Sequence, residues 1–250
     1  MKIIQVVGRS NSGKTTFIEA LIPILREQGS IAVIKHLGHD RFAVNEGKDT
    51  SRYMAAGADR SVGIDDIKSV AILDTADLKT ALTEICDAGV EVCIIEGFKT
   101  IPFPRIVIGD LETEGAVLRN PSTADVISSL ALFEDYYTMQ GVVRELRRTI
   151  STERAGCILT FNGLVREITG DQRTEYLDFA PSIDPIIESL EEEARNTPGV
   201  IGARFHHQKG RLCAGEDITY FALIAEHRQE AFAAMSRAID RLKSEAHNKP

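Results

Sequence analysis

Residues 8–15 read Gly-Arg-Ser-Asn-Ser-Gly-Lys-Thr and match the phosphate-binding pattern G-x-x-x-x-G-K-[S/T] at every fixed position. The two glycines allow a tight turn that directs backbone N–H groups inward, toward phosphate oxygens. The Lys14 ammonium group would reach the β- and γ-phosphates, and the Thr15 hydroxyl group would coordinate Mg²⁺. We expect a nucleotide to be bound by these loop residues: Gly8, Asn11, Ser12, Gly13, Lys14, Thr15 and Thr16.

The segments on both sides of this loop fit that chemistry. Residues 3–7 predict a short strand, and residues 16–22 predict the start of a helix, which is the context that the motif requires. A glycine-rich turn that binds nothing is the alternative, and this context disfavours it. We expect Pro23 to kink or break the helix and Gly29 to end it. The apolar side of the helix should comprise Phe17, Leu21, Ile24 and Leu25.

A carboxylate follows another apolar strand. The predicted strand at residues 90–95 is followed by Glu96. This is the position where P-loop proteins carry an acid that holds Mg²⁺ directly or through water. The residue is Glu rather than Asp, and strand-end acids also occur without a function. A hard cation prefers oxygen ligands, which favours the metal role for Glu96 together with Thr15. No N-K-x-D or T-K-x-D segment follows, so the pattern carries no signature for guanine.

Other polar residues of the first half are open to two interpretations. The predicted strand 31–34 leads to His36 and His39, which either bind a metal or lie in a loop near the phosphates. Two histidines without a third ligand do not make a metal site, so we favour the loop. Lys48 and Arg52, at a short predicted helix, either face a nucleotide or partner, or belong to a solvated surface.

The remaining pattern of this half alternates strands and helices. Strands are predicted at 70–73 and 105–108. A helix from Asp77 should cover the sheet with the apolar stripe Leu78, Ala81, Leu82 and Ile85. The sequence therefore predicts an α/β P-loop NTPase domain with a mostly parallel sheet.

The composition sets limits on the function. The 250 residues carry a formal net charge of −8, which argues against an electrostatic nucleic-acid binder. No apolar run approaches the roughly 18 residues of a membrane span, and the first strand leaves no room for a signal peptide. We therefore expect a soluble cytoplasmic protein that binds neither nucleic acid nor membrane. Its cysteines lack C-x-x-C spacing and should be small buried residues: Cys86, Cys93, Cys157 and Cys213.

Four segments of the first half resemble the MobB family, the adaptors of molybdopterin-guanine dinucleotide biosynthesis. They are the extended loop Gly-Arg-Ser-Asn-Ser-Gly-Lys-Thr-Thr, then Ile-Lys-His, Gly-Lys-Asp-Thr-Ser-Arg with Ala-Gly-Ala, and Ile-Glu-Gly-Phe-Lys, within residues 1–133. The resemblance implies a P-loop domain that binds GTP with Mg²⁺, has weak GTPase activity and is often dimeric. It also implies a MobA-like nucleotidyltransferase as partner. The preference for guanine comes from this resemblance alone.

The second half has a different order of predicted helices and strands. We place the border between 134 and 140, which gives domains 1–136 and 137–250. A basic helix at 142–150 precedes strands that start at 156, 201 and 218 and a helix at 185–194. The last helix should turn Phe232, Met235, Ile239 and Leu242 inward. Without a regular βαβ order, these elements suggest an α+β domain.

Four basic residues of this half are candidates for chemistry. His227 and Arg228 at a helix start would add charge to a backbone end that already attracts anions. Lys243, if it lies among cations, would have a lowered pKa and could act as a nucleophile or base. With Arg166, they could equally be ordinary surface residues, which pattern alone favours.

The order of segments in this half resembles MoaE, the large, catalytic subunit of molybdopterin synthase. Leu-Thr-Phe-Asn-Gly-Leu-Val-Arg, His-Gln-Lys-Gly-Arg-Leu, Gly-Glu-Asp-Ile, Glu-His-Arg-Gln-Glu-Ala-Phe and Ile-Asp-Arg-Leu-Lys occur in sequence within residues 140–250. The resemblance implies sulfur transfer to cyclic pyranopterin monophosphate, a pterin phosphate, from the thiocarboxylated C-terminus of a small MoaD-like subunit. It assigns Arg166, His227 and Arg228 to the anionic substrate pocket and makes Lys243 the catalytic lysine.

The chain departs from the MoaE pattern in places. His207-Gln208-Lys209-Gly210 lacks one arginine of the family, which Lys209 would partly replace, and Leu177-Asp178-Phe179-Ala180 stands for a Tyr-rich stretch. The chain has no Trp, and Lys249 stands near, one residue out of register, where the family has a second catalytic lysine.

The sequence thus predicts a homodimeric protein with two activities of molybdenum cofactor biosynthesis. One alternative is a non-enzymatic adaptor, switched by nucleotide, whose second half only binds the small synthase subunit. A P-loop small-molecule kinase is another, although no acceptor-binding motif is visible.

Overall fold

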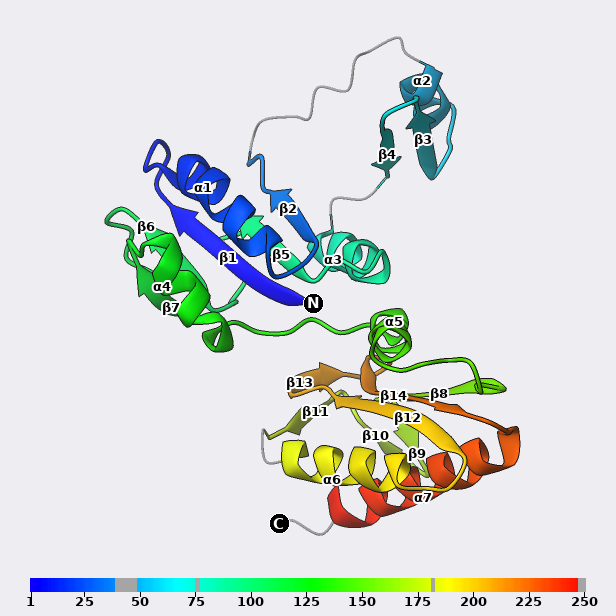
Figure 1. Cartoon of the computed structure of the whole chain (residues 1–250). Helices are drawn as coiled ribbons and strands as arrows, with labels where there is room; N and C mark the ends of the chain where they lie inside the picture. The colour runs from blue at the N-terminus through cyan, green and yellow to red at the C-terminus, as the bar shows by residue number, and fades with distance from the viewer. Residues whose placement is uncertain (39–48, 75–76, 181–182, 247–250) are drawn as a thin grey trace. The chain divides into compact units, whose positions relative to one another are not determined.

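The computed structural model describes residues 1–38, 49–74, 77–180 and 183–246 (Figure 1). The chain divides into two compact units. One comprises Lys2–Ile85 and Val90–Asp135, and the other comprises Met1, Cys86–Gly89 and Tyr136–Pro250. No helix within the described ranges is long and apolar enough to cross a membrane.

A five-stranded sheet forms the centre of the first unit. Its strand order is β2-β5-β1-β6-β7, and every neighbouring pair is parallel. The strands are β1 (Lys2–Gly8), β2 (Ile31–Lys35), β5 (Val92–Glu96), β6 (Arg105–Ile108) and β7 (Ala116–Arg119). The predicted α/β class with a mostly parallel sheet is confirmed. Because all five strands run the same way, their C-terminal ends meet at one edge, where ligands bind in such sheets.

The helix after the phosphate loop packs on this sheet. α1 (Lys14–Arg26) contributes three buried residues to the apolar cluster around β1 and β5: Ile18, Leu21 and Leu25. The predicted break at Pro23 is wrong, since the helix continues through Pro23 to its end. Pro23 cannot donate to the carbonyl of Glu19, but both residues are exposed, so water can replace the missing bond.

The remaining elements of this half surround the sheet or extend from it. They are α2 (Asp49–Ala55), β3 (Arg60–Ile64), β4 (Ser69–Leu73), α3 (Leu78–Asp87), α4 (Thr123–Ser128) and the 3₁₀ helix η1 (Leu130–Leu132). Among the described residues, the predicted strand at 70–73 pairs with β3 alone, in an antiparallel pair separate from the main sheet. In the predicted stripe of α3, Leu78 and Leu82 are buried.

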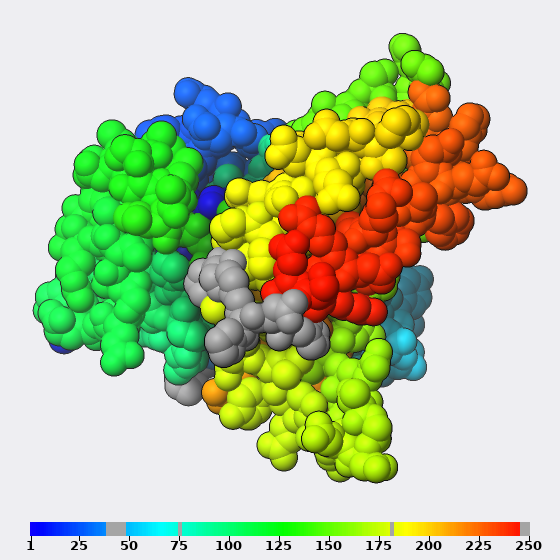
Figure 2. All heavy atoms as spheres, turned by 90° about the horizontal axis from the view of Figure 1, so that it is seen from below, coloured from blue at the N-terminus to red at the C-terminus, as the bar shows by residue number. Residues whose placement is uncertain are grey.

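The second unit is built on a three-stranded antiparallel sheet of order β12-β14-β8. One face packs against α6 and α7, which lie side by side in Figure 2, and the other packs against α5. The main elements are α5 (Met139–Thr149), β8 (Cys157–Leu164), α6 (Asp184–Arg195), β12 (Val200–His207), β14 (Asp217–Ala225) and α7 (Arg228–Ala246). Short strands β9 (Ile168–Thr169), β10 (Gln172–Arg173), β11 (Tyr176–Phe179) and β13 (Gly210–Cys213) complete the α+β domain that the sequence predicted.

Two predictions about burial in this unit are wrong. Phe232 is 59% exposed, because α7 faces the sheet with a stripe of mostly small residues: Ala231, Ala234, Met235, Ala238 and Leu242. Phe232 lies about 100° around the helix from Ala231, outside that stripe. Cys213 is exposed and Cys157 is half-buried, so only Cys86 and Cys93 are the buried cysteines that composition suggested.

Candidate functional site

The phosphate loop connects β1 to α1, and its shape depends on glycine. Gly13 caps α1 in the left-handed region with φ of 88°, and Asn11 has φ of 59°. A Cβ atom on Gly8 would lie 2.3 Å from the Ile108 carbonyl oxygen and 2.5 Å from Ser12 Oγ. Only glycine fits there, so the close approach of the loop to β6 explains the first fixed position of the motif.

The polar groups of the loop are arranged for an anion. Lys14 Nζ donates to the Arg9 carbonyl at 2.6 Å. Burial lowers the pKa of Lys14, Glu96 opposes that shift, and nearby Lys99 and Lys35 add to it. The Ser12 N–H group bonds the same Arg9 carbonyl at 3.3 Å, whereas buried Ser12 Oγ has no partner among the described residues. An orphaned hydroxyl group in a phosphate loop is what a ligand oxygen would satisfy.

The two predicted metal ligands lie together. Glu96 ends β5, is 8% exposed, and accepts a hydrogen bond from Thr15 Oγ1 at 3.3 Å. Lys35 Nζ, at the end of β2, lies 3.3 Å from the same carboxylate oxygen. A hydroxyl and a carboxylate oxygen at this separation fit a small, hard cation that also binds phosphate oxygens and water.

A cavity of about 940 Å³ opens beside these groups. Its lining includes every predicted nucleotide-binding residue, together with His36 and Glu96. It also includes residues to which the sequence analysis gave no role: Ser10, Lys35, Leu37, Gly38, Gly97, Phe98, Lys99 and Thr100. Lys35 ends β2 and Lys99 lies three residues beyond the end of β5, and this position at the C-terminal ends of two parallel strands was the signal for them.

The structure bears on the two interpretations of the histidines and of Arg52 in the first half. His36 lines the cavity, and its ring centroid lies 4.5 Å from that of Phe98. No group of three potential metal ligands occurs in the part of the chain that the structure describes, and His39 lies outside that part. The Arg52 side chain is 73% exposed and pairs with Asp49. Lys48 also lies outside the described residues.

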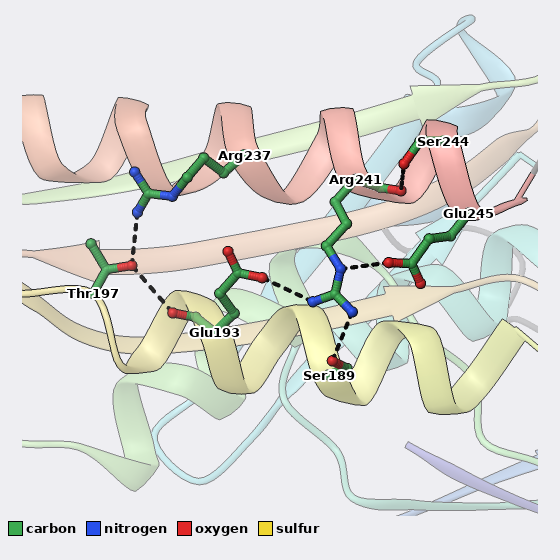
Figure 3. A network of polar contacts seen from close by, with 7 residues as sticks. All are labelled: Ser189, Glu193, Thr197, Arg237, Arg241, Ser244 and Glu245. Carbon is green, nitrogen blue, oxygen red and sulfur yellow. Dashed lines mark hydrogen bonds and ion pairs between the residues drawn. The ribbon is translucent and has the colours of Figure 1, made fainter.

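In the second unit, the direction of the helices decides where Lys243 lies. Figure 3 shows Arg241 of α7 donating to Ser189 Oγ at 3.0 Å and to Glu193 Oε2 at 2.9 Å, both on α6. Arg237 Nη2 donates to Thr197 Oγ1, just beyond the end of α6, at 2.9 Å. The two helices therefore run antiparallel, and the C-terminal end of α7 lies where α6 begins.

Arg166 and Lys243 share this end of the unit. Lys243 is exposed near the end of α7. Lys209, which follows β12, forms a 2.6 Å ion pair with Asp184 at the start of α6. The last residues of β8 pair with the first of β14, beside the end of β12, and Arg166 follows β8.

His227 and Arg228 lie at the opposite end of the same sheet. They follow the last residue of β14, Ala225, which pairs with the first residue of β8. At about 3.3 Å per residue, the eight steps along β14 separate the two ends by roughly 26 Å. Within one chain, the structure therefore does not bring Arg166 and Lys243 together with His227 and Arg228, and Lys249 lies outside the described residues.

A half-buried histidine lies near the end of the sheet that carries Arg166. The His206 ring stacks on Tyr137 with centroids 3.6 Å apart. Burial lowers the pKa of His206 to about 4, a bond to Gln208 opposes that shift, and neighbouring cationic side chains add to it. His206 is therefore neutral at pH 7 and is not one of the cations available to a substrate.

Comparison with protein families gives two matches that together span most of the chain. The model described as "Molybdopterin guanine dinucleotide synthesis protein B" (MobB) matches residues 3–130. The model described as "MoaE protein" matches residues 138–245.

Named relatives follow the same division. The probable molybdopterin-guanine dinucleotide biosynthesis adapter protein of Bacillus subtilis is 40% identical over 127 residues, 46% of this chain and 71% of that protein. The molybdopterin synthase catalytic subunit of Cereibacter sphaeroides is 41% identical over 93 residues, 37% of this chain and 64% of that protein. The probable molybdopterin synthase of Haloferax volcanii is 29% identical over 253 residues, 96% of this chain and 92% of that protein.

Solved structures of both kinds are also similar to parts of the chain. The crystal structure of Bacillus subtilis MobB aligns with 54% of this chain and 100% of its own, at 26% identity and a TM-score of 0.43. The structure of molybdopterin synthase from Staphylococcus aureus aligns with 44% of this chain and 79% of its own, at 28% identity and a TM-score of 0.35.

Proposed function

Because the chain belongs to the MobB family over residues 3–130 and to the MoaE family over residues 138–245, we propose that it joins two activities of molybdenum cofactor biosynthesis. The first domain, residues 1–136, binds GTP as an adaptor for guanine dinucleotide formation. The second, residues 137–250, transfers sulfur to cyclic pyranopterin monophosphate. Both activities take place in the cytoplasm.

One observation carries the nucleotide half: the phosphate loop and the Thr15–Glu96 pair open onto one cavity. Lys14 neutralises phosphate charge, and the N-terminus of α1 attracts the phosphates. Thr15 and Glu96 hold Mg²⁺, which supplies further positive charge at the phosphates. The bound GTP is hydrolysed slowly, and a MobA-like nucleotidyltransferase is the partner of this domain. The Bacillus subtilis relative is named an adapter protein, which fits a domain that acts with a partner.

The nucleotide half is tested by mass spectrometry of the purified protein and by calorimetry. We expect a guanine nucleotide to copurify, and GTP to bind more tightly than ATP and only with Mg²⁺. Equal affinity for GTP and ATP would contradict the proposed preference for guanine. Transfer of phosphate from ATP to a metabolite would instead favour a small-molecule kinase.

The second domain carries basic groups for an anionic pterin and a thiocarboxylate. Arg166, His227 and Arg228 bind the pterin phosphate, and Lys243, with Lys249, assists sulfur transfer from the C-terminus of a MoaD-like subunit. Charge-assisted hydrogen bonds from Arg and His⁺ suit such oxyanions. A relative solved in complex is titled as subunits 1 and 2 of a molybdopterin-converting factor, which supports a small partner subunit.

The separation of these groups supports a homodimer. One chain holds Arg166 and Lys243 at one end of the sheet and His227 and Arg228 at the other. A complete pocket then combines Arg166 and Lys243 of one protomer with the partner's His227 and the partner's Arg228. A two-fold dimer would contain two such pockets.

Mixing two inactive variants tests this composite pocket. Arg166→Ala and Arg228→Ala should each abolish dithiolene formation. In a one-to-one mixture allowed to exchange subunits, half of the dimers are mixed and each of these keeps one intact pocket. Activity should therefore return to roughly a quarter of the unmutated protein. No recovery, with subunit exchange verified by mass, would contradict the composite pocket.

A further inference from the structure

Two buried polar side chains lie beneath the loop that follows β5. Gln5 on β1 is 0% exposed and Arg105 on β6 is 4% exposed. They are register partners on neighbouring parallel strands, so their side chains leave the same face of the sheet. Together they donate hydrogen bonds of 2.5 to 3.1 Å to five backbone carbonyl groups of this loop, those of Gly97, Phe98, Lys99, Ile101 and Phe103.

These bonds decide which way the peptide groups of the loop face. In a planar trans peptide, the N–H group points opposite to the carbonyl group of the preceding residue. Because the carbonyls of residues 97–99 are held by Gln5 and Arg105, the N–H groups of Phe98, Lys99 and Thr100 point away from those two side chains. None of the three has an acceptor among the residues that the structure describes, and all three residues line the cavity beside the phosphate loop.

The conformation of the loop depends on the same support. Phe98 has φ of 51°, in the left-handed region that a bulky residue rarely adopts, and Gly97 before it has φ of 98°. Gln5 Nε2 donates to the carbonyl of Gly97, just before Phe98, and to the carbonyl of Phe98 itself, at 2.8 Å each. A strained residue held by two buried bonds and facing a cavity is typical of a binding loop.

The charge around the loop favours an anion. Arg105 is a buried cation without a carboxylate at ion-pair distance in the described part of the chain, and its partners there are three loop carbonyls and the Thr113 hydroxyl group. The Lys99 carbonyl shares its peptide group with the Thr100 N–H, which therefore points away from Arg105, whereas the carbonyls of Ile101 and Phe103 precede prolines, which have no N–H. Lys14, Lys35 and Lys99 line the same cavity, against one carboxylate, Glu96. Successive amides that point into a concave, cationic surface bind phosphate oxygens.

We propose that the backbone amides of Phe98, Lys99 and Thr100 form a second anion site, in the same cavity as the phosphate loop, which binds a phosphate group, and that Gln5 and Arg105 are its positioning residues. The phosphate is either the terminal phosphate of a bound nucleoside triphosphate or the phosphate of a second ligand beside the nucleotide. The proposal rests on the proposed nucleotide site. The anion site would let that site discriminate between ligands that carry this phosphate and ligands that lack it.

Calorimetry with matched variants tests the proposal. Arg105→Met and Gln5→Met remove the donors; methionine matches glutamine in length and leaves a shorter unbranched chain in place of arginine. Arg119→Met is the control, because Arg119 on neighbouring β7 also donates to a loop carbonyl, that of Leu111 at 2.9 Å, but this loop does not line the cavity. Three titrations are compared: GDP, a non-hydrolysable GTP analogue, and inorganic phosphate added to GDP-saturated protein.

We expect both test variants to bind GDP within twofold of the unmutated protein. Either the GTP analogue or inorganic phosphate should bind about tenfold more weakly to them, and Arg119→Met should change neither. Loss for the analogue assigns the site to the terminal phosphate, and loss for inorganic phosphate assigns it to a second ligand. Unchanged affinities in both titrations would overturn the proposal, as would equal weakening of GDP and the analogue, which indicates general damage to the pocket.

Amide hydrogen exchange keeps the test independent of the nucleotide site. If the unmutated protein does not bind GDP, the proposed nucleotide function fails. Inorganic phosphate alone should then still slow exchange at residues 98–100 in the unmutated protein and not in Gln5→Met. Exchange that phosphate does not alter in the unmutated protein would overturn the anion site. If Arg105→Met does not fold, Arg105→Lys, which keeps a cation and fewer donors, should give an intermediate loss.

Discussion

Replacement of Lys14 by alanine tests the phosphate loop most sharply. In the structure, the Lys14 ammonium group has one hydrogen bond, to the Arg9 carbonyl at 2.6 Å. In the complex it would bond to two phosphates, and hydrogen bonds to charged groups are each worth about 1.5–3 kcal/mol. Lys14→Ala should therefore cost about 3–6 kcal/mol of GTP binding, a loss of roughly 10²- to 10⁴-fold in affinity.

The fold should tolerate the same change. A single hydrogen bond to a loop carbonyl contributes about 1 kcal/mol to stability, so the free energy of unfolding should fall by no more than that. Calorimetry gives the affinity, and urea unfolding gives the stability. Lys68→Ala, the same change at an exposed residue outside the cavity, is the control and should alter neither quantity. An affinity of Lys14→Ala within threefold of the control would refute the assignment of the loop as the nucleotide site.

Two further predictions concern the second unit. Arg241→Gln should lower sulfur transfer several-fold, because Arg241 links the end of α7 that carries Lys243 to α6. Arg237→Gln removes a link from the middle of α7 to Thr197, just beyond the end of α6, and should leave the rate unchanged; equal losses would contradict this role. His206 should make stability depend on pH, since its pKa of about 4 in the folded state lies below the ordinary value of 6.5. The unfolded chain then binds the proton first as the pH falls, so stability is full above pH 6.5 and decreases by about 2–3 kcal/mol toward pH 4. Urea unfolding across that range should show a weaker dependence in His206→Gln, and an identical dependence would contradict the buried, neutral state.

The phosphate loop could be predicted because all of its chemistry lies within eight consecutive residues. Glu96 could be placed beside it because the end of one parallel strand lies close to the end of the next. Gln5 and Arg105 could not be identified in this way. Gln5 interrupts one apolar strand and Arg105 begins another, and their common role depends on the register between β1 and β6, which no local pattern contains.

The second unit shows the same limit. Hydropathy selects Phe232 for the core, whereas the structure buries Ala231 and exposes Phe232, because α7 packs through a stripe of mostly small residues. Sequence order places Arg166, His227 and Lys243 in one predicted pocket. The antiparallel pairing of β8 and β14 and the antiparallel helices α6 and α7 show that a single chain separates Arg166 and Lys243 from His227, and such pairing cannot be read from segment order.

Dithiolene formation by the full-length protein is the most direct test of the central claim, that a synthase activity is joined to a nucleotide-binding domain. Purified protein, cyclic pyranopterin monophosphate and the thiocarboxylated small subunit are combined, and the product is quantified by mass spectrometry. The account predicts product from the unmutated protein and none from Lys243→Ala, with the small subunit bound equally by both. Full product from Lys243→Ala, or none from the unmutated protein while it still binds the small subunit, would contradict it and leave an adaptor in its place.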